Sequence, residues 1–241
     1  MDALVLWDID HTLIENHGVN KETYASAFMM LTGRMAEHQA RTGGRTEPEI
    51  MLEMLRQHGI EPAPDHLARM TEVLEAATLG NVRELGERGH ELPGARDALA
   101  AFQRTGGIVQ SVLSGNIRPN AVTKLSVFGL DTFMDFEAGG YGSDDEARHK
   151  LVAIAQGRAG GKYGVTFSKA NTVLIGDTPR DIQAGLKGGA RVVAVATGSD
   201  SAGVLKAEGA DAVLPDLRDT RAVLAAVTEL LALSRGQVPG L

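Results

Sequence analysis

Five short apolar runs, each followed by turn residues, constrain this chain more than any other feature of its sequence. They cover residues 3–9, 108–113, 172–175, 191–196 and 212–214. Continuous runs of this length are typical of strands that are buried on both faces of a parallel sheet. Helical patterns lie between and after them, at residues 93–104, 118–128, 180–187, 201–208 and 219–233. Strands that alternate with helices predict an α/β fold with a doubly wound parallel sheet.

The stretch between the first two apolar runs breaks this alternation, because it contains only helical patterns. They cover residues 21–34, 47–58, 65–79 and 82–88, and Thr46 with Glu49 forms a capping box at the start of the second. A crossover between parallel strands needs only one helix, so this all-helical block indicates an inserted unit. We therefore predict two domains, an α/β core of residues 1–15 and 91–241 and a small helical cap of residues 16–90.

Composition excludes several classes of function. The chain has 241 residues and no cysteine, which excludes thiolate zinc sites, iron–sulfur clusters and cysteine nucleophiles. With 24 basic and 31 acidic side chains its net charge is −7, and only 4% of its residues are aromatic, so we expect no nucleic-acid partner. No apolar stretch approaches about 18 residues, so we expect no membrane span. These features predict a cytoplasmic globular protein that is a monomer or a small homo-oligomer.

Polar residues follow three of the predicted strands, at the edge where open parallel sheets bind ligands. They are Asp8, Asp10 and Thr12 after the first, Ser114, Gly115 and Asn116 after the second, and Asp177 and Asp181 after the third. Four converging carboxylates would repel one another unless a cation neutralised them. Mg²⁺ takes carboxylate oxygens together with a substrate phosphate, whereas no histidine pair has the spacing of a zinc site. Asp177 and Asp181 are one helical turn apart, so both can hold the metal from one side.

The residue types at this edge also suggest catalytic roles. Asp8 and Asp10 lie two residues apart at a strand end, so both can face one pocket. One carboxylate can attack as a nucleophile and form an aspartyl intermediate, while the other passes protons to the leaving oxygen and takes them from water. Thr12, Ser114 and backbone N–H groups of the loops can hold a phosphoryl group.

The motifs together resemble those of the haloacid dehalogenase superfamily, in its phosphatase branch. The family has Asp-x-Asp-x-Thr/Val after the first strand, a Ser or Thr at the end of the next core strand, and a later Gly-Asp-x-x-x-Asp. The matching residues are Asp8, Asp10, Thr12, Ser114, Gly176, Asp177 and Asp181. The resemblance covers nearly the whole chain and includes a helical cap of the first type, as in phosphoglycolate phosphatase-like members. It implies hydrolysis of a small phosphorylated metabolite.

The resemblance also implies a role for each matching residue. Asp8 would be phosphorylated, Asp10 would be the general acid and base, and Ser114 would bind the phosphoryl oxygens, with Gly115 and Asn116 beside it.

Mg²⁺ is the implied cofactor. The resemblance implies that it is held by Asp8, by the Asp10 carbonyl and by Asp177, with Asp181 supporting it directly or through water.

The family's third motif, a Lys or Arg ahead of the fourth, has two candidates here. We favour Arg148, because an apolar pair follows it three and four residues later, and Lys150 is the alternative. The chain departs from the family at His11, where many members have Gly. Arg45 lies in a loop that resembles the family's cap specificity loop, so it either closes over the substrate or is an exposed turn residue.

Other functions remain open at this point. A phosphosugar mutase of the same superfamily has the same core chemistry, whereas a dehalogenase needs neither a metal nor the second aspartate, so Asp10 argues against it. A phospho-accepting signalling module without turnover is a candidate from a different class. Such modules are about half this length and have no helical insertion.

Overall fold

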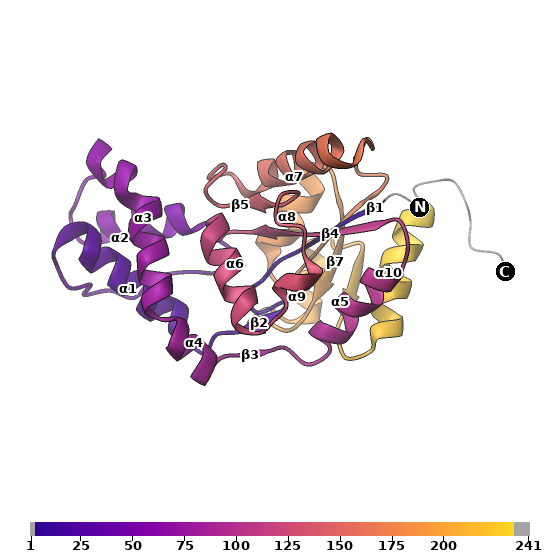
Figure 1. The fold of residues 1–241 in the computed structure, drawn as a ribbon, viewed down its shortest axis with the longest axis horizontal. Helices are drawn as coiled ribbons and strands as arrows, with labels where there is room; N and C mark the ends of the chain where they lie inside the picture. The colour runs from indigo at the N-terminus through magenta and orange to yellow at the C-terminus, as the bar shows by residue number, and fades with distance from the viewer. Residues whose placement is uncertain (1–2, 234–241) are drawn as a thin grey trace.

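The computed structural model describes residues 3–233, and a six-stranded parallel sheet forms its centre (Figure 1). The strands lie in the order β5-β4-β1-β6-β7-β8. Their bounds are β1 Ala3–Trp7, β4 Ile108–Ser114, β5 Gly140–Tyr141, β6 Thr172–Gly176, β7 Arg191–Val195 and β8 Ala212–Leu214. All five predicted strands are present, which confirms the predicted fold class. The edge strand β5 was not predicted, because only two of its residues pair, with the end of β4.

Helices cover both faces of the sheet, and the alternation along β1 shows how. Val5 and Trp7 pack towards α5 and α10, whereas Leu4 and Leu6 pack towards α7 and α8. All these strand side chains are fully buried, which explains why β1 has no polar face. The helices of this unit are α5 Ala95–Arg104, α6 Arg118–Val127, α7 Arg148–Tyr163, α8 Pro179–Gly188, α9 Ala202–Ala207 and α10 Thr220–Leu233, with a 3₁₀ turn, η1, at Asp131–Phe133. No helix within residues 3–233 is long and apolar enough to cross a membrane.

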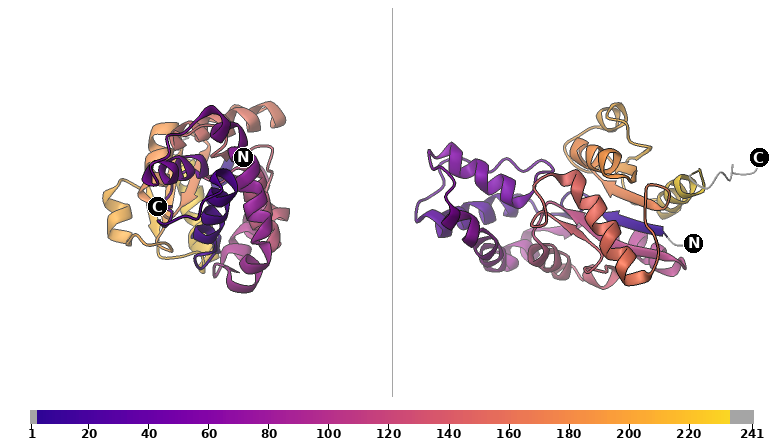
Figure 2. Two further views of the ribbon diagram at one scale, coloured as in Figure 1. Left: turned by 90° about the vertical axis from the view of Figure 1, so that its left-hand side faces the viewer. Right: turned by 90° about the horizontal axis from the view of Figure 1, so that it is seen from above.

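Four helices between β1 and β4 form a separate group at one end of the molecule (Figures 1 and 2). They are α1 Val19–Thr32, α2 Glu47–Gln57, α3 Pro64–Gly80 and α4 Val82–Arg88, as predicted. Phe28, Met51, Leu55 and Leu74 form part of a hydrophobic cluster of their own. We call this group the cap, and its exact domain boundaries stay a prediction.

The cap joins the core through a short antiparallel ribbon that was not predicted. Its strands are β2 Ile14–Glu15 and β3 His90–Glu91. Two residues in each strand carry no detectable periodicity, so only the tertiary structure reveals the pairing. The ribbon holds the two chain segments that connect the cap to the core side by side, close to the end of β1.

Candidate functional site

The register of the sheet brings the predicted carboxylates together. β1 lies between β4 and β6, with Trp7 level with Ile175. Asp8 follows directly, and its backbone N–H donates to the Ile175 carbonyl at 2.9 Å. Ser114 ends β4 and Asp177 follows the last residue of β6. The polar residues after these strands therefore lie at one edge of the sheet, as predicted.

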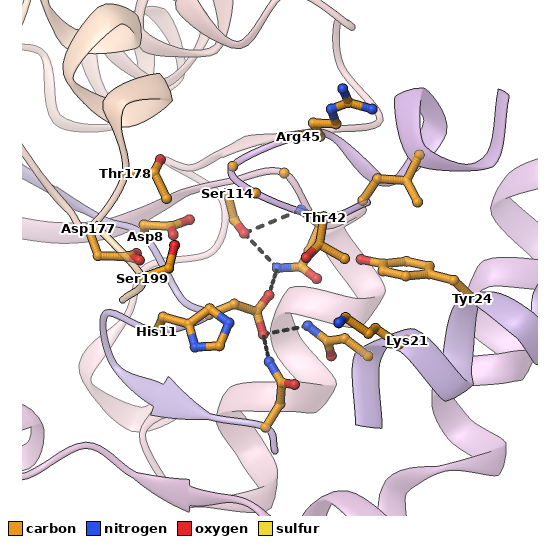
Figure 3. Close-up of a pocket in the computed structure, with 18 of the residues that line it drawn as sticks. Asp8, His11, Lys21, Tyr24, Thr42, Arg45, Ser114, Asp177, Thr178 and Ser199 are labelled. Carbon is orange, nitrogen blue, oxygen red and sulfur yellow. Dashed lines mark hydrogen bonds between the residues drawn. The ribbon is translucent and has the colours of Figure 1, made fainter. Parts of the chain in front are cut away.

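A cavity of about 410 Å³ lies over this edge and is lined by both the core and the cap (Figure 3). Eight of the predicted site residues line it: Asp8, Asp10, Arg45, Ser114, Gly115, Asn116, Arg148 and Asp177. Thr12 and Asp181 are fully buried and bond to side chains that belong to the same cluster. Nearly all the predicted site residues thus line the cavity or bond to side chains of this cluster.

Arg148, the first residue of α7, lies between two of the carboxylates. Its Nη2 atom donates to Asp8 at 2.8 Å and also to Asp181, and all three side chains are almost fully buried. Burial and the charge of Asp181 raise the pKa of Asp8 to about 7, although Arg148 acts in the opposite direction. Burial would lower the pKa of Arg148, but the two carboxylates keep it above its usual value. This position suits the third-motif cation, because it touches the predicted nucleophile.

Asp181 is fixed by the start of α8. Thr178 caps this helix and accepts from the Asp181 N–H, while Oδ2 of Asp181 accepts from the Thr178 N–H at 3.0 Å and from its hydroxyl at 2.6 Å. Pro179 suits the first turn of the helix because no helical partner is needed for its nitrogen. Both carboxylate oxygens of Asp181 thus accept hydrogen bonds from the protein, and its negative charge adds to that of Asp8.

The buried carboxylates fit a divalent cation. Asp8, Asp177 and Asp181 offer oxygens that all lie within 4.8 Å of one another. Thr12 donates to Oδ1 of Asp177 at 2.9 Å, but within the described residues no protein donor reaches Oδ2 of Asp177 or Oδ2 of Asp8. Burial and the neighbouring carboxylates raise the pKa of Asp177 well above its usual value. Three acidic side chains face the single positive charge of Arg148. The negative charge that remains fits a divalent cation with oxygen ligands, such as Mg²⁺.

Asp10 has a different environment, because five donor contacts surround its carboxylate. Lys124 donates to both oxygens at 2.9 and 3.2 Å, Asn116 donates at 3.0 Å, Asn20 at 2.8 Å and Asn16 at 3.3 Å. Burial would raise the pKa of Asp10, but the charge and hydrogen bonds of Lys124 and the amides of Asn116 and Asn20 lower it to about 2. Asp10 is therefore held as a carboxylate in this arrangement.

Sequence reasoning missed Lys124, although a signal was present. Lys124 is only 3% exposed and lies on the buried stripe of α6 with Ala121 and Leu125, in line with Ile117 just before the helix. A charged residue within an apolar stripe at helical spacing needs a buried partner. That pattern would have indicated an ion pair, but not which carboxylate it joins.

Ser114, the last residue of β4, and Gly115 directly after it lie next to the cap. The Asn116 amide donates to the Ser114 hydroxyl oxygen at 2.6 Å, which leaves the hydroxyl proton for a ligand. A Cβ added at Gly115 would lie 2.1 Å from the Arg45 carbonyl oxygen, so glycine permits a close approach of the cap loop. Glu47 strengthens this contact, since its N–H donates to the Gly115 carbonyl at 2.8 Å.

The Glu47 side chain joins the cap to the core and was also missed. It is 1% exposed, and its Oε2 accepts from the Ile117 N–H at 2.8 Å and from Asn120 at 2.9 Å. Burial raises its pKa to about 6 despite the charge of Lys124. Its only sequence signal was its place beside Thr46 in the capping box, which predicts a helix start and no tertiary contact.

Two predicted residues are placed differently from the rest. Lys150 is 58% exposed, pairs with Asp145 at 2.9 Å and does not line the cavity, so the structure does not bring it to the site. Arg45 lines the cavity, but its guanidinium pairs with Glu49 at 3.5 Å and with Glu53.

His11 occupies the position where many members of the family have glycine. Its φ of 62° lies in the left-handed region that glycine adopts without strain, and its Nδ1 atom lies 2.9 Å from a Glu15 carboxylate oxygen. The departure therefore keeps the backbone conformation that this turn requires.

Comparisons with known proteins agree with this arrangement. Solved structures with similar folds include a hydrolase from Pseudomonas syringae, with a TM-score of 0.67 and 18% identity over 94% of this chain and 99% of that one. A predicted phosphoglycolate phosphatase from Haemophilus somnus has a TM-score of 0.63 and 16% identity over 92% and 98%. A protein from Bacteroides vulgatus, provisionally assigned as a beta-phosphoglucomutase, has a TM-score of 0.64 and 19% identity over 95% and 90%. At these identities the likeness establishes the fold alone.

Sequence comparison identifies the family. No curated protein matches the chain. The profile of the haloacid dehalogenase-like hydrolases, however, matches residues 5–185, a segment that begins in β1 and ends in α8. Because this segment covers most of the chain and contains all the motifs described above, the chain belongs to the haloacid dehalogenase-like hydrolase family.

Proposed function

We propose that this hydrolase is a Mg²⁺-dependent phosphatase that cleaves a small phosphorylated metabolite through an aspartyl phosphate on Asp8. The observation that supports it best is the position of Asp8, a buried carboxylate with one oxygen on Arg148 and the other open to the cavity. Ser114 and Arg148 line the cavity beside it and can bind phosphoryl oxygens.

The reaction has two halves. In the first, an oxygen of Asp8 attacks phosphorus and the bond from phosphorus to the leaving oxygen breaks. That oxygen receives the proton that Asp10 took from water in the second half of the preceding cycle. In the second, Asp10 takes a proton from water, whose oxygen attacks phosphorus and releases phosphate and the Asp8 carboxylate. Lys124, Asn116 and Asn20 hold Asp10 as the base that this second half needs.

Asp8, Asp177 and the Asp10 carbonyl would hold Mg²⁺, with Asp181 as supporting charge. When bound, the ion would offset the negative charge of the phosphoryl oxygens. The acidic cluster makes this compensation necessary, because Arg148 alone leaves the site negative where a phosphate must bind.

Phosphate release from 4-nitrophenyl phosphate by the purified full chain tests the proposal. We expect release with Mg²⁺, none with a chelator and none from Asp8→Asn, with all proteins folded by circular dichroism. Asp65→Asn is the matched control, because Asp65 is an exposed carboxylate on α3. Release that is unchanged in Asp8→Asn, or absent from the wild-type protein with Mg²⁺, would refute the proposal.

A phosphosugar mutase is the second candidate, and the cap contact over the cavity favours it. The Gly115 carbonyl accepts from the Glu47 N–H of the cap, so the cap lies against the core beside the cavity, where it can limit the access of water to an aspartyl phosphate. Incubation with a sugar phosphate distinguishes the two activities. A phosphatase yields free phosphate, whereas a mutase yields an isomeric sugar phosphate.

A further inference from the structure

The cavity has two walls of different chemical character. The carboxylates that line it, Asp8, Asp10 and Asp177, all belong to the core. The ionisable side chains that line it from the cap are Lys21, Tyr24 and Arg45, and none of these is acidic. The part of the substrate that faces the cap is the leaving group, because the phosphoryl group must lie against Asp8. The leaving group therefore meets a wall that carries cations and hydroxyls.

Lys21 is the cap cation that is available to a ligand. It lies in the first turn of α1 and its side chain extends, with that of Tyr24, from this helix into the cavity (Figure 3). Within residues 3–233 no carboxylate pairs with the Lys21 ammonium, whereas Arg45 is paired with Glu49 and Glu53. An exposed lysine at a cavity wall attracts anions when no carboxylate is paired with it.

The hydroxyls of Tyr24 and Thr42 on this wall can accept as well as donate, but its two cations favour an anion over a neutral polyol. Lysine and arginine side chains only donate, so Lys21 and Arg45 cannot accept from a sugar hydroxyl. The amide groups of Asn16 and Asn20 at the same rim already donate to Asp10. A carboxylate or phosphate accepts from all the donors present, and a charge-assisted bond is stronger than a neutral one.

We infer that Lys21 is a specificity-determining residue that binds a second anionic group, a carboxylate or a phosphate, on the leaving-group side of the substrate. This inference rests on the proposed phosphatase function and narrows its substrate class. The preferred substrate is then a phosphomonoester with two separated negative groups, the phosphoryl group at Asp8 and the second group at Lys21.

Two matched substrate pairs test the inference. 3-Phosphoglycerate and glycerol 3-phosphate differ in one carboxylate, and glucose 1,6-bisphosphate and glucose 6-phosphate differ in one phosphate, so the pairs distinguish the two kinds of anion. The measured quantity is the ratio of kcat/KM for the charged member to that for its partner. We expect the ratio to exceed one for at least one pair in the wild-type protein. Lys21→Gln should lower that ratio by about tenfold, mainly through KM, since a hydrogen bond between charged groups is lost.

Two further variants make the test specific. Lys21→Arg keeps the charge and should restore most of the ratio. Lys187→Gln removes an exposed lysine from the last turn of α8 and should leave the ratio at the wild-type value. Because Lys21 is exposed, its substitution is not expected to disturb the fold, which circular dichroism checks.

The outcomes separate this inference from the proposed function. Suppose that the wild-type protein hydrolyses 4-nitrophenyl phosphate. The role of Lys21 would then be overturned by a wild-type ratio at or below one for both pairs, or by a Lys21→Gln ratio equal to the wild-type ratio. If the wild-type protein does not hydrolyse 4-nitrophenyl phosphate, the proposed function fails and this inference fails with it.

Discussion

At the scale of single residues, the two aspartates of the first motif have opposite electrostatic environments. Burial and Asp181 raise the pKa of Asp8 to about 7, whereas Lys124 and three amides keep Asp10 ionised. Carboxyl groups whose environments separate their pKa values are typical of catalytic sites. A divalent ion beside Asp8 would stabilise its ionised form and so lower its pKa.

The first prediction concerns Lys124, the cation that pairs with Asp10 at 2.9 Å. Lys124→Met should raise the pKa of Asp10 by about 1 unit or more, because an opposite charge at contact distance lowers a carboxyl pKa by about 1–3 units. Titration of the ¹³C-carboxyl signals by NMR in the metal-free protein measures this change. Lys206→Gln, which removes an exposed lysine on α9, is the control.

The same pair has a consequence for acid stability. The Asp10 pKa is lower in the folded protein than the ordinary value of 3.8, so it stabilises the fold above pH 4, and this contribution is lost as the pH falls towards 2. The contribution is about 2 kcal/mol, and Lys124→Met should remove most of it. An Asp10 pKa that stays near 2 in this variant would contradict the assignment of Lys124.

The second prediction decides between the two candidates for the third-motif cation. Arg148→Met should reduce the hydrolysis of 4-nitrophenyl phosphate by a factor of about 100 or more, because it removes the guanidinium that touches Asp8. Lys150→Gln should keep the rate within about twofold of wild type, since surface ion pairs such as that with Asp145 contribute little. A larger loss in Lys150→Gln than in Arg148→Met would reverse the assignment.

At the scale of secondary-structure elements, the contact between α2 and α6 joins cap and core. Glu47 begins α2, and its carboxylate accepts from the N–H of Ile117, the residue just before α6, and from the side-chain amide of Asn120 in its first turn. A negative charge is favourable at this end of a helix. Its burial has the opposite effect, since its pKa rises to about 6. The hydrogen bonds favour the ionised carboxylate, but burial outweighs them, so Glu47 stabilises the fold most when it is protonated, and this contribution falls as the pH rises.

The third prediction follows from this sign. Because the folded pKa of about 6 exceeds the ordinary value of 4.5, the contribution of Glu47 to stability is present below pH 4.5 and is lost as the pH rises through 6. Relative to wild type, Glu47→Gln should gain about 2 kcal/mol in the free energy of unfolding between pH 4 and pH 7. Urea denaturation at several pH values measures this, with the exposed residue of α3 in Glu72→Gln as control. A pH-independent difference would contradict it.

The elements also show what the sequence could and could not predict. Continuous apolar runs predicted β1, β4, β6, β7 and β8, because burial on both faces leaves a pattern in the chain itself. The two-residue strands β2, β3 and β5 leave no such pattern, since their pairing depends on where distant segments meet.

The same distinction applies to the site. Asp8 and Asp177 were predictable because motifs place them directly after strands. The partners of Asp10 were not, because Lys124 lies 114 residues away and reaches Asp10 only through the packing of α6 in the tertiary structure. The choice between Arg148 and Lys150 depended in the same way on the side that each presents once α7 is formed.

At the scale of the whole molecule, the net charge is −7, and part of it lies in one buried cluster. Lys124 neutralises Asp10, but among residues 3–233 Arg148 is the one cation paired with the cluster of Asp8, Asp177 and Asp181, so this cluster keeps uncompensated negative charge where the core meets the cap. Buried like charges of this kind destabilise the fold until a cation enters. Metal binding, protonation and stability should therefore be linked through this one cluster.

The fourth prediction concerns that linkage. The raised pKa values of Asp8 and Asp177 mean that protons stabilise the metal-free fold at low pH and that this stabilisation is lost as the pH rises through about 7. Mg²⁺ should compete with these protons, so its stabilising effect should grow from pH 5.5 to pH 8. At 100 times its dissociation constant, Mg²⁺ adds about 2.7 kcal/mol, which corresponds to roughly 5–10 °C in Tm for a chain of this size. Differential scanning calorimetry with Mg²⁺ and with a chelator measures the shift.

Two variants tie this shift to the cluster rather than to the surface. Asp177→Asn removes one of the open carboxylate oxygens and one buried charge, so it should raise the Tm of the metal-free protein and abolish most of the Mg²⁺-dependent increase. Asp65→Asn removes an exposed charge and should leave the increase as in wild type. An increase that is the same at pH 5.5 and pH 8 would mean that Mg²⁺ does not displace protons from Asp8 and Asp177, and the metal would then have to bind elsewhere on the molecule.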